Sequence, residues 1–351
     1  DVDNADDSLV FTISNLAGGT FYNTASGLYV TSFTQADVTA GNIYFRHDGG
    51  EAAPSYEVSV SDGTLSSPAA AATISFTNVN DAPVNNLPGL DQDVVSSGAD
   101  GATAVFAADL DGDGNVDLVS SSWSDDRVAW YQNDGAGNYT EYTIDTGLTG
   151  ARHVFVADID GDTHLDVLVS DYENDTVTWY ESDGGATPTF TAHTVTSTAD
   201  GTWSSYAIDM DADGDMDILS ASIWDDKVSW YENDGGATPS FTEHVITTNA
   251  DGVRTVVAGD LDGDGDIDVA SASYIDDKIA WYESDGAGGF TEHVVTTNAL
   301  GAMSLTIGDI DADGNQDLIT ASYADGKIAW FQNDGTATPT FSENIISTDA
   351  L

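Results

Sequence analysis

Aspartate clusters recur along the chain at a spacing that suits a metal ion. Each cluster has Asp at the first, third, fifth and ninth positions of a short loop, and four of the five clusters have Gly at the sixth. Alternate carboxylates on a tight turn can converge on one point, where glycine permits a positive φ at the bend. The acidic side chains are Asp109, Asp111, Asp113, Asp117, Asp158, Asp160, Asp162, Asp166, Asp209, Asp211, Asp213, Asp217, Asp260, Asp262, Asp264, Asp268, Asp309, Asp311, Asp313 and Asp317.

Calcium is the ion that this donor set predicts, with one site in each of the five loops. It takes about six to eight oxygen ligands, whereas magnesium keeps more water and zinc prefers His or Cys. Two carboxylates about 4 Å apart repel by roughly 4 kcal/mol at an effective dielectric of about 20, so solvated Asp-Gly turns are the weaker interpretation. A main-chain carbonyl at the seventh position should complete each site. These residues are Asn115, His164, Asp215, Asp266 and Asn315.

The second loop departs from the pattern at its sixth position, where Thr163 replaces glycine. A β-branched residue is strained at positive φ. We therefore expect the second loop to bind its metal most weakly or with altered geometry.

The loops belong to a sequence repeat whose copies are 49, 51, 51 and 49 residues apart. That period suits one four-stranded blade of a β-propeller. In the copy 252–300, runs of β-branched and aromatic residues between Asp- and Gly-rich turns predict strands. The predicted strands are 253–259, 267–273, 278–283 and 290–297.

The third strand of every copy carries two adjacent aromatic residues, as in Trp281-Tyr282. Neighbouring side chains on a strand point to opposite faces, so both faces of each sheet should be covered, as in stacked blades. Residues 93–97 match the end of a repeat and predict one additional fourth strand. Either both termini complete one blade, or further blades follow Leu351.

Composition narrows the class of protein. The chain has 61 acidic and 7 basic residues, a net charge of −54, which repels nucleic acid and anionic membranes. No cysteine is present, which excludes disulfides and thiol chemistry. No segment has the apolar length of a membrane-spanning helix. The sequence begins without Met or a signal peptide and is interpreted as a mature product or an internal piece.

The block Asp-x-Asp-Gly-Asp-Gly-x-x-Asp, followed by a short apolar strand, resembles the FG-GAP/VCBS repeats of integrin-α-type propellers. The resemblance covers residues 92–351. It implies structural calcium in the five loops, and seven blades are usual in that family, whereas this sequence has five repeats.

The N-terminal part is similar to a cadherin-like repeat of the chondroitin-sulfate-proteoglycan type, through the segments 33–38, 43–49, 56–63 and 79–83. It implies a β-sandwich over residues 1–82, joined by a linker over 83–91. Its usual first strand is missing, which suggests either truncation or a strand donated by a neighbour. Cadherin-like domains often bind calcium at their junctions, so Asp1, Asp3 and Asp81 are either further ligands or ordinary turn residues.

Several other residues recur at fixed repeat positions. The histidines His193, His244 and His293 lie on different blades, so their spacing predicts neither a metal site nor a catalytic site. The basic residues predict local ion pairs, with a clamp on a ligand carboxylate as the alternative. The aromatic residues near one turn predict packing between blades or a platform for sugar rings. The basic residues are Arg127, Lys227, Lys278 and Lys327, together with Arg152 and Arg254; the aromatic residues are Trp123, Tyr172, Trp224, Tyr274 and Tyr323.

These observations predict an all-β, extracellular, calcium-binding protein, secreted or at the cell surface, that acts in adhesion or as a scaffold. Its expected partners are other cell-surface or matrix proteins, glycans, or further copies of itself, without nucleic acid or membrane insertion. No catalytic triad or phosphate-binding loop is found, and the acidic residues repeat with the blade instead of breaking its symmetry, so we do not expect an enzyme. The alternatives are a calcium-dependent lectin and a non-catalytic module of a larger secreted polysaccharide-active enzyme.

Overall fold

The computed structural model describes residues 9–47, 53–72 and 94–350, in two compact units, Asp1–Asp93 and Val94–Leu351. Asp1, Asp3, Asp81 and the linker 83–91 lie outside the described residues. In the part of the chain that is described, no helix is both long and apolar enough to cross a membrane.

The first unit consists of two antiparallel sheets, with strand orders β4-β1-β6-β7 and β3-β2-β5. Phe21, on one sheet, contacts Phe33 and Tyr56 on the other, at ring-centroid distances of 5.6 and 5.0 Å. This aromatic cluster joins the sheets, as the cadherin-like resemblance predicts. The strands are β1 (Val10–Ala17), β2 (Gly19–Asn23), β3 (Leu28–Val30), β4 (Ser32–Thr34), β5 (Ile43–His47), β6 (Ser55–Ser61) and β7 (Ala70–Ala71).

A short helix, α1 (Gln35–Thr39), interrupts this unit and was not expected from the sequence. Thr34 caps it: the Thr34 hydroxyl accepts a hydrogen bond from the Asp37 N–H at 3.1 Å, and the Asp37 carboxylate accepts one from the Thr34 N–H at 3.0 Å. This capping box stabilises a single turn that is too short to show helical periodicity in the sequence.

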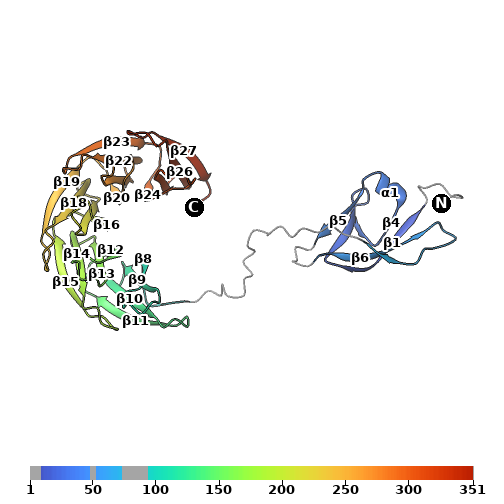
Figure 1. Ribbon diagram of the computed structural model, residues 1–351, viewed down its shortest axis with the longest axis horizontal. Helices are drawn as coiled ribbons and strands as arrows, with labels where there is room; N and C mark the ends of the chain where they lie inside the picture. The colour runs from blue at the N-terminus through green and yellow to red at the C-terminus, as the bar shows by residue number, and fades with distance from the viewer. Residues whose placement is uncertain (1–8, 48–52, 73–93, 351) are drawn as a thin grey trace. The chain divides into compact units, whose positions relative to one another are not determined.

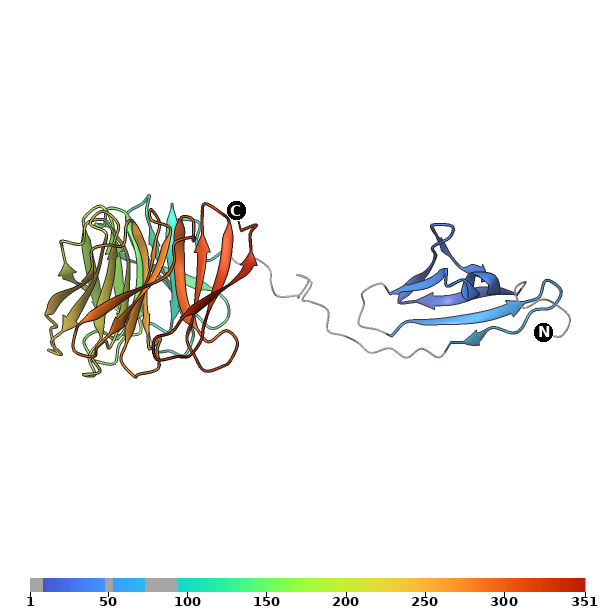
Figure 2. The ribbon, with the colours of Figure 1, turned by 90° about the horizontal axis from the view of Figure 1, so that it is seen from above.

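The second unit contains five four-stranded antiparallel sheets, the blades, each formed by four consecutive strands. Figure 1 shows them around a common axis, with β8, β12, β16, β20 and β24 innermost, and Figure 2 shows the same blades from the side. The strands are, in blade 1, β8 (Ala102–Ala108), β9 (Asp117–Ser122), β10 (Arg127–Asn133) and β11 (Tyr139–Asp145); in blade 2, β12 (Ala151–Ala157), β13 (Asp166–Asp171), β14 (Thr176–Ser182) and β15 (Phe190–Thr196); in blade 3, β16 (Thr202–Ile208), β17 (Asp217–Ser222), β18 (Lys227–Asn233) and β19 (Phe241–Thr247); in blade 4, β20 (Val253–Gly259), β21 (Asp268–Ser273), β22 (Lys278–Ser284) and β23 (Phe290–Thr296); and in blade 5, β24 (Ala302–Gly308), β25 (Asp317–Ser322), β26 (Lys327–Asn333) and β27 (Phe341–Ser347).

The third strands are buried on both faces, as the paired aromatic residues predict. Trp281 and Tyr282 are each 1 % exposed, and the corresponding pairs of blades 1 to 3 are also buried. Trp281 lies in a cluster with Phe331 of the next blade. Each blade therefore uses one aromatic face to pack on its neighbour, which explains why the repeat needs apolar residues on both sides of the sheet.

The ring is open between blades 1 and 5 (Figure 1). Val105 of blade 1 is 65 % exposed, whereas Val256, at the same position of blade 4, is 2 % exposed. Ile310 of blade 5 is 45 % exposed, whereas the corresponding Leu261 is 2 % exposed. Each internal face is covered by the next blade, and these two outer faces are uncovered within the described chain.

The additional fourth strand predicted at residues 93–97 is wrong for its described part, since 94–97 form no strand. The turn that follows a fourth strand is nevertheless reproduced: the Ser96 hydroxyl accepts a hydrogen bond from Gly98 N–H at 3.0 Å, as Thr296 does from Asn298 at 3.1 Å. The sequence match therefore reports a shared turn, and β11 already supplies the fourth strand of blade 1.

Lysine side chains join neighbouring blades, although the sequence predicted only local pairs. Lys278 is 8 % exposed, and its ammonium lies 2.9 Å from Glu292 and 3.4 Å from Asp276. It also donates to the Asn249 carbonyl of blade 3 at 2.6 Å. Lys327 makes the corresponding contacts from blade 5 to blade 4. Burial makes these pairs more important than exposed ion pairs.

Replacing Lys278 by Thr is expected to lower the free energy of unfolding by about 2 kcal/mol, because two half-buried carboxylates lose their counter-charge. Thermal or urea unfolding measures the loss. The matched control copies blade 2, which has Asn174, Thr176 and Ala192 at these positions. The triple variant Asp276→Asn, Lys278→Thr, Glu292→Ala should recover at least half of the loss, and no recovery would contradict the assignment.

Candidate metal centres

The ninth loop position is the structural anchor of each loop. Asp268 opens β21, is fully buried, and accepts hydrogen bonds from Leu261 N–H at 2.9 Å and Ser284 N–H at 2.8 Å. These bonds tie the loop to the end of the third strand. The other four blades repeat both bonds, with Asp117, Asp166, Asp217 and Asp317 as acceptors.

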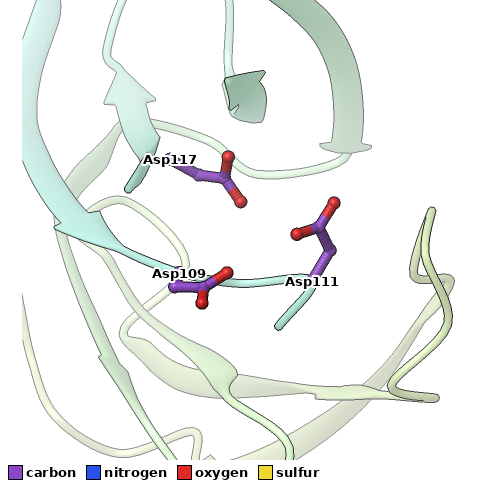
Figure 3. Close-up of side chains that lie close together, drawn as sticks. All are labelled: Asp109, Asp111 and Asp117. Carbon is purple, nitrogen blue, oxygen red and sulfur yellow. The ribbon is translucent and has the colours of Figure 1, made fainter. Parts of the chain in front are cut away.

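Three carboxylates converge in every blade. In blade 1, oxygens of Asp109, Asp111 and Asp117 lie within 4.8 Å of one another, and Figure 3 shows the three side chains facing a common centre. The first and third loop positions supply two of them, and the ninth supplies the buried one. The same positions converge in the other blades, at Asp158, Asp160 and Asp166, Asp209, Asp211 and Asp217, Asp260, Asp262 and Asp268, and Asp309, Asp311 and Asp317.

The fifth position differs from the other three acidic positions of each loop. Asp264 is exposed and accepts a hydrogen bond from Asp266 N–H at 2.9 Å, which closes a local turn. Neither Asp264 nor its equivalents Asp113, Asp162, Asp213 and Asp313 belong to the converging groups. The fifth position therefore shapes the loop here, while its part as a ligand stays a prediction.

The seventh position, predicted for its main-chain carbonyl, uses its side chain to pack beneath the turn between the third and fourth strands. A Cβ added at Gly286 would lie 2.5 Å from the Asp266 carboxylate, and one at Gly135 would lie 2.6 Å from the Asn115 amide. His164 takes this place in blade 2 and bonds through Nδ1 to Asp162 at 2.9 Å, which raises the pKa of the imidazole. Coordination by the seventh carbonyl stays a prediction.

Burial and mutual repulsion disfavour the negative charges of these groups. Burial raises the pKa of Asp166 to about 7 and the pKa values of Asp217 and Asp268 to about 6. Oδ1 of Asp109 and Oδ1 of Asp158 are buried without a hydrogen-bond partner among the described residues. Two unit charges 4.8 Å apart repel by roughly 3.5 kcal/mol at an effective dielectric of about 20. A bound divalent cation would satisfy these oxygens and remove the repulsion.

The loop backbone is left-handed at two positions, although the sequence predicted only the sixth. At the fourth position, Ala212 and Ala312 have φ of 60° and 61°. At the sixth, Thr163 has φ of 77° and Gly265 has φ of 98°. The strain expected at Thr163 is therefore present in its backbone, while its effect on metal binding stays a prediction.

The effect of this strain on metal binding is tested by exchanging the residue types of Thr163 and Gly265. Thr163→Gly is expected to stabilise the protein by about 1 kcal/mol and to raise calcium affinity at the second loop, because the strain is relieved. Gly265→Thr should lower both the stability and the calcium affinity of the fourth loop. A Cβ there meets nothing within 4 Å, so the loss would come from backbone strain alone. Calorimetric titration and thermal unfolding measure both. Lower calcium affinity in Thr163→Gly would count against the assignment.

A neighbouring position was missed by the sequence analysis. Gln132 and Gln332 donate from Nε2 to the third-position carboxylates Asp111 and Asp311, at 2.5 and 2.6 Å. Blades 2 to 4 have Glu there, as in Glu232, which pairs with His244 at 2.7 Å. The sequence shows that this position varies together with one on the fourth strand. Glu occurs where the fourth strand has His, and Gln occurs where it has Tyr or Asn. The carboxylate groups of blades 1 and 5 therefore have a neutral glutamine beside them, whereas those of blades 2 to 4 have a glutamate.

The predicted histidines are thus half-buried strand residues. His193, His244 and His293 stack on the tryptophans of their own blades with ring centroids 4.6 Å apart, and each pairs with a glutamate at 2.7 Å. They lie on three separate sheets. The structure brings no two of them together.

Five four-stranded sheets around one axis, each with a group of three aspartates after its innermost strand, define a β-propeller. The chain belongs to the family of FG-GAP-like repeats, whose model matches residues 109–169, 158–220, 209–271 and 260–320. Residues 1–76 match a cadherin-like model. Both resemblances inferred from the sequence are confirmed. A comparison with curated proteins finds no match.

Solved structures show the same fold. A Lactobacillus plantarum protein is 20 % identical, with 70 % of this chain and 71 % of that chain covered and a TM-score of 0.52. A putative 6-phosphogluconolactonase from Bacteroides uniformis is 11 % identical, with 98 % of both chains covered and a TM-score of 0.50. An Agrocybe aegerita lectin that recognises non-reducing terminal N-acetylglucosamine is 19 % identical, with coverages of 71 % and 67 % and a TM-score of 0.49. At these identities the likeness to the first two structures concerns the fold alone, and nothing is argued from the third.

Proposed function

We propose that this chain is an extracellular, calcium-binding β-propeller that acts in adhesion or as a scaffold. The observation that carries the proposal is the convergence of three carboxylates at the same place in all five blades. Calcium suits sites made of oxygen donors, and the three aspartates of each blade would hold it. The bound ion would neutralise each group and hold the loop against the ends of β9, β13, β17, β21 and β25, so that the rim keeps one shape for a partner.

An extracellular location is supported by the domain pair, because cadherin-like and FG-GAP-like domains are typical of proteins outside the cell. Millimolar calcium outside cells suits weak sites on extracellular modules. The absence of cysteine leaves metal ions as the available cross-links in an oxidising environment.

Sedimentation of the full chain across a concentration series, with calcium and with chelator, tests the scaffold function. We expect assemblies or partner complexes that form only with calcium. A chain that stays monomeric at all concentrations and binds no matrix or cell-surface protein in either condition would argue against an adhesion or scaffold role.

Glycan binding is the second candidate function, and the aromatic residues at the opposite end of the blades favour it. The innermost strand of each blade runs towards its aspartate loop, so Trp224 and Tyr323 lie at the other end, where they are 60 % and 64 % exposed. Exposed aromatic rings can stack on sugars. A glycan array compared between the wild type and Trp224→Ala tests this function. If neither protein binds any glycan, the function is excluded.

A further inference from the structure

Two arginines at the inner strands of the propeller have no acidic partner. Among the described residues, no carboxylate lies within 4.0 Å of Arg152, near the start of β12, or Arg254, near the start of β20. The other basic residues of the propeller, Arg127, Lys227, Lys278 and Lys327, are all in ion pairs. In a chain with a net charge of −54, two uncompensated cations that contact the same tryptophan require an explanation.

The two guanidinium groups are held by aromatic rings from several blades. Cζ of Arg152 lies 3.6 Å from the ring centroid of Trp123 and 4.3 Å from that of Trp203. Cζ of Arg254 lies 4.3 Å from Trp203 and 3.8 Å from Tyr274. Rings and cations thus alternate across blades 1 to 4. These contacts hold both guanidinium groups in place, while their N–H groups stay available as donors.

Polar atoms around this ladder lack partners. Nε of Arg152, Nε of Arg254 and Nδ1 of His153 are buried without a hydrogen bond in the described structure. Burial lowers the pKa of His153 to about 4, so its imidazole is neutral and can donate or accept. Among the described residues, the terminal nitrogens of the two arginines make a single hydrogen bond, from Nη1 of Arg254 to Sδ of Met303 at 2.7 Å.

The ladder borders a cavity of about 560 Å³ inside the propeller, lined by Arg152, His153, Trp203 and Met303 among other residues of the inner strands. A cavity of this size takes a ligand of one or two sugar rings. Trp224 continues the aromatic surface outward, because its ring lies 6.2 Å from Tyr172, which itself lies 5.2 Å from the Arg152 guanidinium.

We propose that this site binds a uronic acid at the end of a glycan, with its carboxylate on the Arg152 guanidinium edge and its ring against the aromatic residues. The proposal rests on the second candidate function, glycan binding, and names the sugar class. Arginine is the side chain best suited to bidentate carboxylate binding. The acidic surface repels long polyanions, so a single acidic residue fits better than a polyuronate chain.

The test is a titration of the full, calcium-loaded chain with D-galacturonate, D-galactose and acetate, followed by tryptophan fluorescence and calorimetry. Galacturonate should bind with a millimolar Kd, at least about tenfold more tightly than galactose or acetate. Arg152→Gln should weaken it by about tenfold or more, because it removes a charged hydrogen bond. Arg254→Gln should weaken it less, because Arg254 is not among the residues that line the cavity. Arg46→Gln, in the first unit, is the matched control and should bind as the wild type does.

The wild type alone can overturn the proposal, even where a variant fails to fold. No saturable signal with galacturonate up to about 50 mM would exclude a millimolar site. Equal affinity for galactose would remove the carboxylate from recognition, and equal affinity for acetate would reduce the site to one for any small anion. Calcium-dependent stability is measured separately, so failure here leaves the calcium-binding proposal intact, and a glycan-array signal that excludes uronates would reject only the sugar class.

Discussion

Chelation of calcium is expected to lower the Tm of the propeller by at least about 10 °C. A ligand that binds only the native state contributes about 2.7 kcal/mol per site at a free concentration about 100-fold above Kd. Five occupied sites would together equal much of the stability of an ordinary domain. Without the ions, each blade keeps three converging carboxylates, and burial raises the pKa values of Asp166 and Asp217, the buried members in blades 2 and 3.

Differential scanning calorimetry of the full chain, with calcium or with excess chelator, measures this effect. The first unit, which has its own aromatic core, supplies an internal reference because its described residues contain no group of converging carboxylates. Magnesium should restore less of the stability than calcium, since it holds its water more tightly and uses fewer carboxylates. A melting curve unchanged by excess chelator would refute calcium binding.

Asp268→Ala is expected to lower the free energy of unfolding by about 3–5 kcal/mol, both with calcium and with chelator. The Asp268 side chain is fully buried and accepts the N–H groups of Leu261 and Ser284. Its removal leaves two donors unsatisfied in the interior and a cavity beside them, in addition to the lost metal ligand. Urea unfolding in both conditions measures the loss.

Two variants in the same loop separate structure from metal binding. Asp262→Asn keeps the oxygen that accepts from Asp264 N–H at 3.1 Å but removes a charge, so it should lose stability with calcium and gain it in chelator. Asp264→Ala, at the exposed fifth position, should cost less than about 1 kcal/mol in chelator. A calcium affinity lost equally in both variants would show that the fifth position is a ligand. Equal losses for Asp268→Ala and Asp264→Ala in chelator would contradict the anchoring role.

Much of the fold could be predicted from the sequence because the repeat carries strong local signals. The strand 253–259 was predicted with the bounds that β20 has, and the paired aromatic residues predicted two-sided burial. The helix α1 was missed, because one capped turn leaves no periodic pattern. The false strand at 94–97 arose because a matching turn sequence cannot show whether a neighbouring strand is free to pair.

The candidate site divides in the same way. The acidic loops and the strain at Thr163 follow from residue types at fixed spacing, which are local properties. The separate roles of Asp268 and Asp264 are not local: one is buried under the end of the third strand and the other faces solvent. The spacing of the aspartates along the loop does not distinguish these two carboxylates.

The sequence by itself determined the blade, its strands and the acidic loop of each repeat, because short-range alternation and turn chemistry are written in neighbouring residues. Only the tertiary structure decided which carboxylates converge, which lysines join blades, and that Arg152 and Arg254 share one aromatic ladder. The two arginines are about a hundred residues apart in sequence. Their meeting depends on how sheets stack around an axis, which spacing along the chain does not encode.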